Sequence, residues 1–213
     1  AKLMSDAELT LAAGKIYNPN PGYTFGGKGY FGSRIQPNSP TDDPEEVLFS
    51  CLEGLSYGCG DVVLGLNPVD SDRKNVKRLE ETLRDVVKTF GLEKATTWCV
   101  LAHIDDQMAI NDTPENPDIP GTPPGGGLVN VGFQSLGGTA KTNATFNIDV
   151  EKMLLHLSKI DHQYFETGQG SAFTNNAADG VDMVTLESRA YGLSRAFAKK
   201  THNWTIVNDV AGF

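Results

Sequence analysis

One carboxylate in the sequence is notable for its position. Glu166 lies in "QYFETGQGSAFTNNA", residues 163–177, between a short apolar run and a glycine-rich turn. A carboxylate at such a point can exchange a proton with a substrate or bind a cation. It can equally cap a helix or pair with an arginine for structural reasons alone. The surrounding elements must therefore decide what Glu166 does.

Other side chains with useful chemistry stand in similar places. Arg34 and Gln36 of "SRIQPN" are two residues apart, so on a strand they face the same side. Asn67 follows the apolar run "DVVLGL". A guanidinium can bind an oxygen and keep a nearby carboxylate ionised, and an amide can donate and accept at once. Taken singly, each has an ordinary alternative: a surface salt bridge, a solvated strand end and an Asn-Pro turn, respectively.

Short β-type runs would carry these residues. Most runs are apolar at consecutive positions, which is typical of strands buried on both faces. They cover residues 33–38, 61–68, 96–104, 127–136, 163–168 and 204–213. Helical patterns lie between them, at 44–57, 72–90, 147–160 and 180–200, and an opening helix is expected near 5–17. The Pro/Gly/Asn-rich stretch 105–127 is expected to form a loop.

Strands separated by helices predict a parallel sheet, either doubly wound or closed as a barrel. Polar residues late in the runs favour the barrel, because its strand ends converge on one site. These residues are Arg34, Gln36, Asn67, His103, Gln134, Ser135, Glu166, Asn208 and Asp209. We therefore expect a barrel of alternating strands and helices rather than an open sheet. Residues 1–213 would form a single domain, a partial barrel preceded by a short helical segment at about 1–30.

The composition restricts the class of partner. A formal charge of −9 and a pI near 4.9 argue against nucleic acid or an anionic membrane. No apolar run approaches the roughly 20 residues that cross a bilayer, and the first residues lack a signal-peptide pattern. Cys51, Cys59 and Cys99 are odd in number and show no CxxC spacing. A reducing cytoplasm is the expected compartment.

Two other kinds of site are conceivable from the sequence, a metal site and the carboxylate pair of a glycosidase. In "AHIDD", His103 lies beside Asp105 and Asp106, but the sequence contains no HxxxH or HxH pair, so a protein-ligated metal is not expected. Asp61 and Glu166 could form the carboxylate pair of a glycosidase. Asp61 is better explained as a residue that begins its strand.

Seven segments, in the same order and with similar spacing, resemble the large catalytic subunit of ethanolamine ammonia-lyase. They are "SRIQPN", "GLSYGCGDVVLGLNPV", "CVLAH", "GFQSLGG", "YFETGQGSA", "TLESRAYGLSRAF" and "VNDVAGF". The resemblance covers roughly residues 5–213 and is weakest in 105–127 and 139–162. It implies a (β/α)8 TIM barrel with about six of its eight strands present in this chain, a separate small subunit in a hetero-oligomer, and adenosylcobalamin between the subunits. It also implies a cytoplasmic enzyme, which in this family can lie within a bacterial microcompartment.

The family converts ethanolamine, a small amino alcohol, to acetaldehyde and ammonia by radical chemistry that the cofactor supplies. The resemblance implies that Glu166 is the acid/base and holds the substrate ammonium, and that Arg34 is its catalytic partner. It further assigns Gln36 and Asn67 to the substrate, Phe213 to the substrate's carbon skeleton and Ser135 to the adenosyl group. A non-catalytic barrel fragment, or a module that binds an amino alcohol or cobalamin, is the alternative.

Two departures from the family pattern affect these expectations. Thr145 stands where family members usually carry an acidic residue near the adenosyl ribose. The sequence also stops after the sixth strand run, before the family's seventh strand and its further acidic ligand. We therefore expect the chain to be a fragment of a longer polypeptide, inactive alone.

Overall fold

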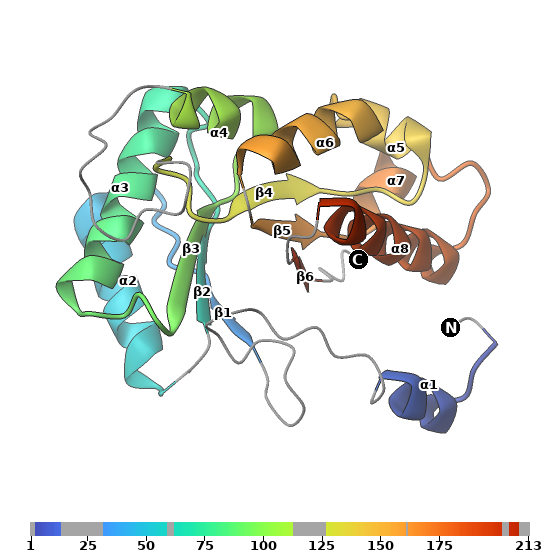
Figure 1. Ribbon diagram of the computed structural model, residues 1–213, viewed down its shortest axis with the longest axis horizontal. Coiled ribbons are helices and arrows are strands. Elements are labelled where there is room, and N and C mark those ends of the chain that lie inside the picture. The colour runs from blue at the N-terminus through green and yellow to red at the C-terminus, as the bar shows by residue number, and fades with distance from the viewer. Residues whose placement is uncertain are drawn as a thin grey trace. The chain divides into compact units, whose positions relative to one another are not determined.

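Helices and strands alternate along the chain, as Figure 1 shows. The computed structural model describes residues 3–13, 32–58, 62–112, 127–160, 162–201 and 205–208. The elements are α1 (Asp6–Ala13), β1 (Ser33–Ile35), α2 (Pro44–Ser56), β2 (Val62–Leu66), α3 (Arg73–Thr89), β3 (Thr96–Val100), α4 (Ile104–Asn111), β4 (Gly132–Ser135), α5 (Ala140–Thr145), α6 (Val150–Lys159), β5 (Gln163–Glu166), α7 (Gly170–Thr174), α8 (Met183–Thr201) and β6 (Thr205–Asn208).

The chain divides into two compact units. The first comprises the described residues of Asn18–Phe133 and Lys159–Asp161, and the second those of Ala1–Tyr17, Gln134–Ser158 and His162–Phe213. The described strands form two three-stranded sheets, in the order β1-β2-β3 and β4-β5-β6. The first sheet lies in the first unit, and the second lies in the second unit except for the start of β4, Gly132 and Phe133.

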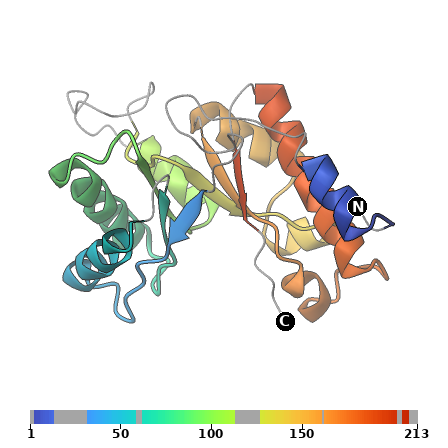
Figure 2. The same cartoon turned by 90° about the horizontal axis from the view of Figure 1, so that it is seen from below.

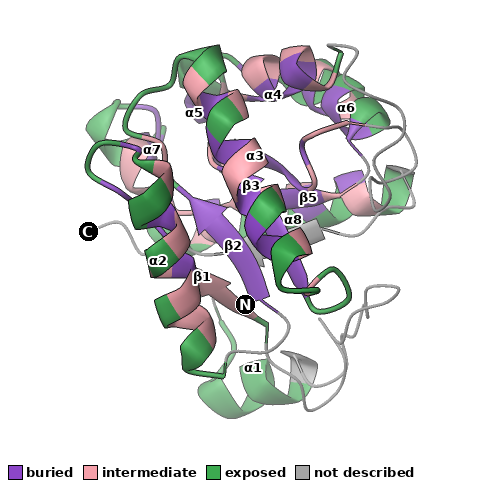
Figure 3. Cartoon of the chain, turned by 90° about the vertical axis from the view of Figure 1, so that its left-hand side faces the viewer, coloured by how far each residue is buried: buried purple, intermediate pink, exposed green. Residues whose placement is uncertain are grey.

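The first unit is built around two strands that are buried along their whole length. All five residues of β2 and of β3 are buried, as their continuous apolar runs predict, and Figure 3 shows this burial along β2. β1 pairs with β2 in parallel, and β2 pairs with β3 in parallel. The register places Arg34 beside Val63.

Two helices cover this sheet. α2 packs against β1 and α3, and α3 packs against β3 (Figures 1 and 2). Along α3, Val76, Leu79 and Leu83 recur at helical spacing and are fully buried. Asp72 caps the start of α3 through the Lys74 N–H, and Gly91 adopts a φ of 64° just after its end. Helix caps and apolar periodicity thus fix α3 locally.

Beyond β3, side chains make hydrogen bonds that a neighbouring strand would otherwise supply. The Trp98 N–H donates to Asn130 Oδ1 at 3.2 Å, and the Val100 N–H donates to Glu80 Oε1 at 3.2 Å.

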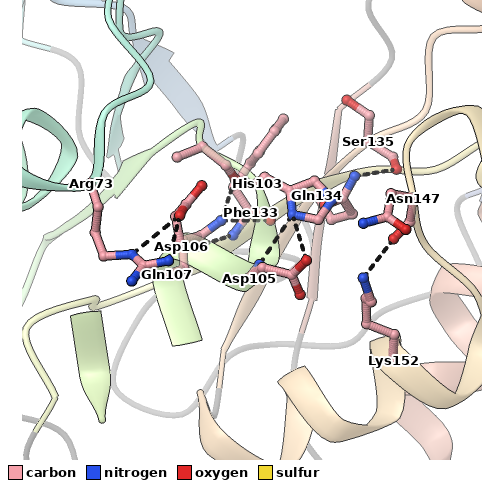
Figure 4. Close-up of polar contacts among 11 residues, drawn as sticks. Arg73, His103, Asp105, Asp106, Gln107, Phe133, Gln134, Ser135, Asn147 and Lys152 are labelled. Atoms are coloured by element: carbon pink, nitrogen blue, oxygen red, sulfur yellow. Dashed lines mark hydrogen bonds and ion pairs between the residues drawn. The ribbon is translucent and has the colours of Figure 1, made fainter. Parts of the chain in front are cut away.

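Gln107 of α4 plays a similar part. Its Nε2 donates to the Ala102 and Phe133 carbonyl oxygens at 2.5 and 2.8 Å, and its Oε1 accepts from the Phe133 N–H at 2.8 Å (Figure 4). One backbone bond also crosses here, from the Val131 N–H to the Trp98 carbonyl oxygen. We call the bonds of Glu80, Gln107 and Asn130 the β3 seam.

The second unit contains the end of β4 and all of β5 and β6, and β5 and β6 pair in parallel. α8 packs against β6, and the ring of Phe197 on α8 lies 6.1 Å from that of Phe165 on β5. α6 buries Met153, His156 and Leu157. The helical stripe and the apolar strand again meet in a packed interior.

The α/β class with parallel strand pairs is confirmed. Each described strand lies within its predicted run, and the described strands form two three-stranded sheets, without closing into a barrel. Part of the predicted loop 105–127 is wrong, because residues 104–111 form α4. His103 caps that helix and two acidic residues occupy its first turn, which favours a helix start. α5 and α7 are short helices that the sequence pattern did not indicate.

Candidate active site

Arg34 reaches from β1 across the neighbouring strand β2. Its Nε and Nη2 donate to the Gly65 carbonyl oxygen at 3.3 and 3.2 Å, and Nη2 also donates to Asn67 Oδ1 at 2.6 Å. A Cβ atom at position 65 would lie 2.6 Å from Arg34 Nε. Glycine in the middle of β2 therefore leaves space for the guanidinium, where any side chain would displace it.

Gln36 joins the same group from the residue after β1. Its Nε2 donates to Asn67 Oδ1 at 3.3 Å. Arg34 is half-buried, whereas Gln36 and Asn67 are exposed. Because arginine can only donate, the Asn67 oxygen must face it, and the Asn67 amide N–H2 is directed away. Arg34, Gln36 and Asn67, which we call the β1–β2 polar group, are thus held together at the carboxyl ends of two parallel strands.

Glu166 ends β5 in the second unit and is half-buried. The hydroxyl of Tyr164, two residues earlier on the same face, donates to Glu166 Oε1 at 3.3 Å. Tyr164 is fully buried, so its phenol is a fixed donor for the carboxylate. The strand register pairs Glu166 with Asn208 of β6. Two predicted strand-end residues are therefore neighbours.

Ser135 ends β4, the strand beside β5. It is half-buried, and Gln134 Nε2 donates to its carbonyl oxygen at 3.1 Å (Figure 4). Gln134 Oε1 is buried and has no hydrogen-bond partner among the described residues. The Leu136 N–H donates to the Glu166 carbonyl oxygen at 2.8 Å, which joins the ends of the two strands.

A buried amide supports the turns after β4 and β5. Gln169 is 1% exposed; its Oε1 accepts from the Gly138 N–H at 2.9 Å, and its Nε2 donates to the Leu136 carbonyl oxygen at 3.2 Å. Glu187 of α8 accepts from the Thr167 hydroxyl and from Gln169 Nε2. The roles of Gln169 and Glu187 were not predicted from the sequence. Both lie in the quoted motifs "YFETGQGSA" and "TLESRAYGLSRAF", which were the available signal.

The remaining predicted residues fall into two classes. Thr145, at the end of α5, donates to the Thr142 carbonyl oxygen at 2.7 Å and accepts from Asn175 at 3.4 Å. Phe213, Asp209, Asp61 and Cys59 lie outside the described residues. The role of Phe213 therefore stays a prediction.

The histidine and aspartates of "AHIDD" have structural partners. His103 Nδ1 accepts from the Asp105 N–H at 3.2 Å as the cap of α4, and Arg73 pairs with Asp106 at 3.0 Å (Figure 4). Within the described ranges, no three His, Cys, Asp or Glu side chains are grouped as they would be around a metal ion. No helix in the described part of the chain has the length and apolar character to cross a membrane.

Comparison with known proteins gives one consistent result. The family model for the ethanolamine ammonia lyase large subunit (EutB) matches residues 1–213. The chain is 36% identical to the ethanolamine ammonia-lyase large subunit of Escherichia coli K12 and 35% identical to that of Salmonella typhimurium LT2. Each alignment covers 100% of this chain and 45% of the relative, so the chain spans about half the length of these relatives. On this evidence, the chain belongs to the ethanolamine ammonia-lyase large subunit family.

Proposed function

We propose that this chain supplies substrate-binding and catalytic residues for the conversion of ethanolamine to acetaldehyde and ammonia. The observation that carries the proposal is the β1–β2 polar group, in which Arg34, Gln36 and Asn67 are hydrogen-bonded together at adjacent strand ends. The family match supports ethanolamine as the substrate that this group would bind. The proposed architecture is the (β/α)8 barrel within a single domain, to which the described strands contribute about six of eight.

The substrate offers one ammonium and one hydroxyl, and the chain carries a group suited to each. Glu166 binds the ammonium, because a half-buried carboxylate attracts a cation more strongly than one in bulk water. The Tyr164 hydroxyl holds the Glu166 carboxylate in one orientation. Glu166 also accepts and returns the proton that moves when the amino group leaves.

The β1–β2 polar group binds the hydroxyl oxygen. The guanidinium of Arg34 is fixed across β2 by its bonds to Gly65 and Asn67, so its charge is already oriented when substrate arrives. The Asn67 side-chain N–H2 donates to the substrate, and the Gln36 side-chain oxygen, Oε1, accepts from the substrate. Phe213 packs against the carbon skeleton.

Adenosylcobalamin is the cofactor in this proposal. The end of β4 fits the adenosyl group, because Ser135 offers a hydroxyl and the buried Gln134 Oε1 offers an acceptor that the described residues leave unpaired. When bound, the cofactor supplies the radical that takes a hydrogen from the carbinol carbon. A small subunit completes the hetero-oligomer, in the cytoplasm or within a bacterial microcompartment.

Acetaldehyde release tests the proposal. The full-length gene product is assembled with its small subunit and adenosylcobalamin, and ethanolamine is added. We expect aldehyde formation that requires all three components and the β1–β2 polar group. Binding of ethanolamine or cobalamin without any turnover would favour the alternative, a binding module that keeps the strand-end residues.

A further inference from the structure

Asp42 is a buried carboxylate at the end of the segment that follows β1. It is 2% exposed and has a φ of 54°, which is uncommon for a residue other than glycine. Its Oδ1 and Oδ2 accept from the Val69 N–H at 2.9 and 3.0 Å, and Oδ2 accepts from the Asp70 N–H at 2.8 Å. Asn75 Nδ2 also donates to Oδ2 at 2.7 Å. All three donors lie at least 27 residues further along the chain.

With these bonds, every backbone N–H group in residues 67–70, the turn after β2, has an acceptor. Pro68 has no N–H, and the Asn67 N–H donates to Asn38 Oδ1 at 2.9 Å. Every backbone N–H of 67–70 is therefore bound by a side chain from the segment after β1. Asn38 and Asp42 together form what we call the 38–42 strap.

The strap holds the backbone of the turn that carries the Asn67 side chain. The side chain of Asn67 contacts Arg34 and Gln36, and its backbone N–H donates to Asn38, two residues after Gln36. The turn after β2 is thus attached to the segment after β1 at both its first residue and its last. A turn that is attached at both ends cannot shift Asn67 relative to Arg34 without breaking hydrogen bonds.

The neighbouring residue shows that this arrangement is distinct from ordinary helix capping. Asp43 accepts from the Glu45 and Glu46 N–H groups and caps α2. Asp42 contributes its carbonyl oxygen to Arg78, at 3.0 Å, but directs its carboxylate toward the turn after β2. Two adjacent aspartates therefore serve two different elements.

We propose that Asp42 is a positioning residue that holds Asn67 in its binding geometry. The catalytic consequence rests on the proposed function, whereas the effect on the turn does not. Removing the carboxylate should make residues 67–70 more mobile. It should weaken ethanolamine binding only because Asn67 is then no longer held in place.

The first test is hydrogen exchange on the full-length protein. Asp42→Asn keeps the size of the side chain but replaces one acceptor oxygen by a donor that faces backbone N–H groups. We expect exchange in a peptide covering 67–72 to accelerate about tenfold or more, as expected for losing hydrogen bonds to a charged group. The matched control is Asp43→Asn, which should leave that peptide unchanged and retain the cap of α2, because asparagine caps a helix about as well as aspartate. Unchanged exchange in Asp42→Asn would overturn the proposal.

The second test is a double-mutant cycle with the assembled enzyme, adenosylcobalamin and ethanolamine. If Asp42 acts through Asn67, Asp42→Asn should lower kcat/KM about tenfold in the parent and less than twofold in the Asn67→Ala background. Additive losses would show a merely structural role and refute the positioning claim. If Asp42→Asn does not fold, Asn38→Ala, at an exposed residue, must show the same coupling to Asn67. If the parent enzyme does not consume ethanolamine, the proposed function fails while hydrogen exchange still decides whether the strap exists.

Discussion

At the scale of single residues, the contacts of Arg34 require the shape of a guanidinium as well as its positive charge. Its guanidinium donates to the Gly65 carbonyl oxygen from Nε and Nη2 and to Asn67 Oδ1 from Nη2. An ammonium group has no planar fork and cannot reproduce this arrangement across a strand. The geometry of the β1–β2 polar group therefore depends on arginine specifically.

Replacing Arg34 by lysine is expected to lower kcat/KM for ethanolamine about 100-fold or more, as for the loss of a fixed donor to a reacting oxygen. Steady-state acetaldehyde release measures the loss, and added guanidinium should restore part of it. Arg73→Lys is the matched control, because Arg73 is exposed and forms an ion pair with Asp106 of α4. A fully active Arg34→Lys enzyme would mean that a diffuse positive charge is sufficient.

Glu166 offers the complementary test. Glu166→Gln keeps the shape and the oxygen that accepts from Tyr164, but it removes the negative charge and the exchangeable proton. Turnover should fall by about 100-fold, the usual effect of deleting an acid/base group. Glu151→Gln, at an exposed position on α6, should be neutral. Near-normal turnover in the Glu166 variant would remove Glu166 from its assigned role.

At the scale of elements, the helix α3 buries an ionisable group against β3. Glu80 is fully buried, and its burial raises the pKa of the carboxyl to about 8, although the Val100 N–H and the Trp98 indole favour the ionised form. Between the ordinary pKa of 4.5 and the raised pKa, the folded chain keeps a proton that the unfolded chain releases. Stability associated with Glu80 is thus fully present below pH 4.5 and is lost as the pH rises toward 8.

We therefore expect Glu80→Gln to remove a pH dependence of up to about 1.4 kcal/mol per pH unit in the free energy of unfolding. Urea midpoints at pH 5 and pH 8 should converge for the variant and differ for the parent. Glu81→Gln, one residue further along α3 and partly exposed, should retain the parent's dependence. Equal pH dependence in parent and Glu80→Gln would show that Glu80 ionises freely in the folded chain.

The local sequence pattern predicted the helices and strands better than it predicted the side chains that hold the turns between them. Every described strand lies within a predicted β-type run, and most of these runs are apolar at consecutive positions. Arg34 and Gln36 contact a common partner, Asn67, as two residues on one face would. The start of α4 was missed because the Pro/Gly-rich residues after Asp112 dominated the composition of the stretch. Asp42 and Gln169 could not be found from sequence, because their partners lie about 30 residues away and only the fold brings them together.

At the scale of the whole molecule, the relatives that the chain matches are about twice its length, and they are named as large subunits. The proposed adenosyl contact must therefore be tested in the assembled enzyme. Ser135 is the described residue for which this test is most direct.

Ser135→Ala should weaken adenosylcobalamin binding about fivefold to tenfold, the effect of one lost hydrogen bond, and leave cyanocobalamin binding unchanged. Absorbance titration of the assembled enzyme with each cobalamin measures both affinities without turnover. Ser188→Ala, at an exposed position on α8, serves as the control. An equal loss for both cobalamins would place Ser135 away from the adenosyl group.

The β3 seam has a consequence for how this fold can change. Hydrogen bonds between paired strands survive almost every substitution, because all residues except proline carry the backbone N–H. Most of the bonds beyond β3 belong instead to Glu80, Gln107 and Asn130, which a single nucleotide change can replace. Single substitutions can therefore loosen the contact of β3 with α3 at Glu80, its contact with Asn130, and the contact that Gln107 makes between Ala102 and Phe133, while β1, β2 and β3 stay paired.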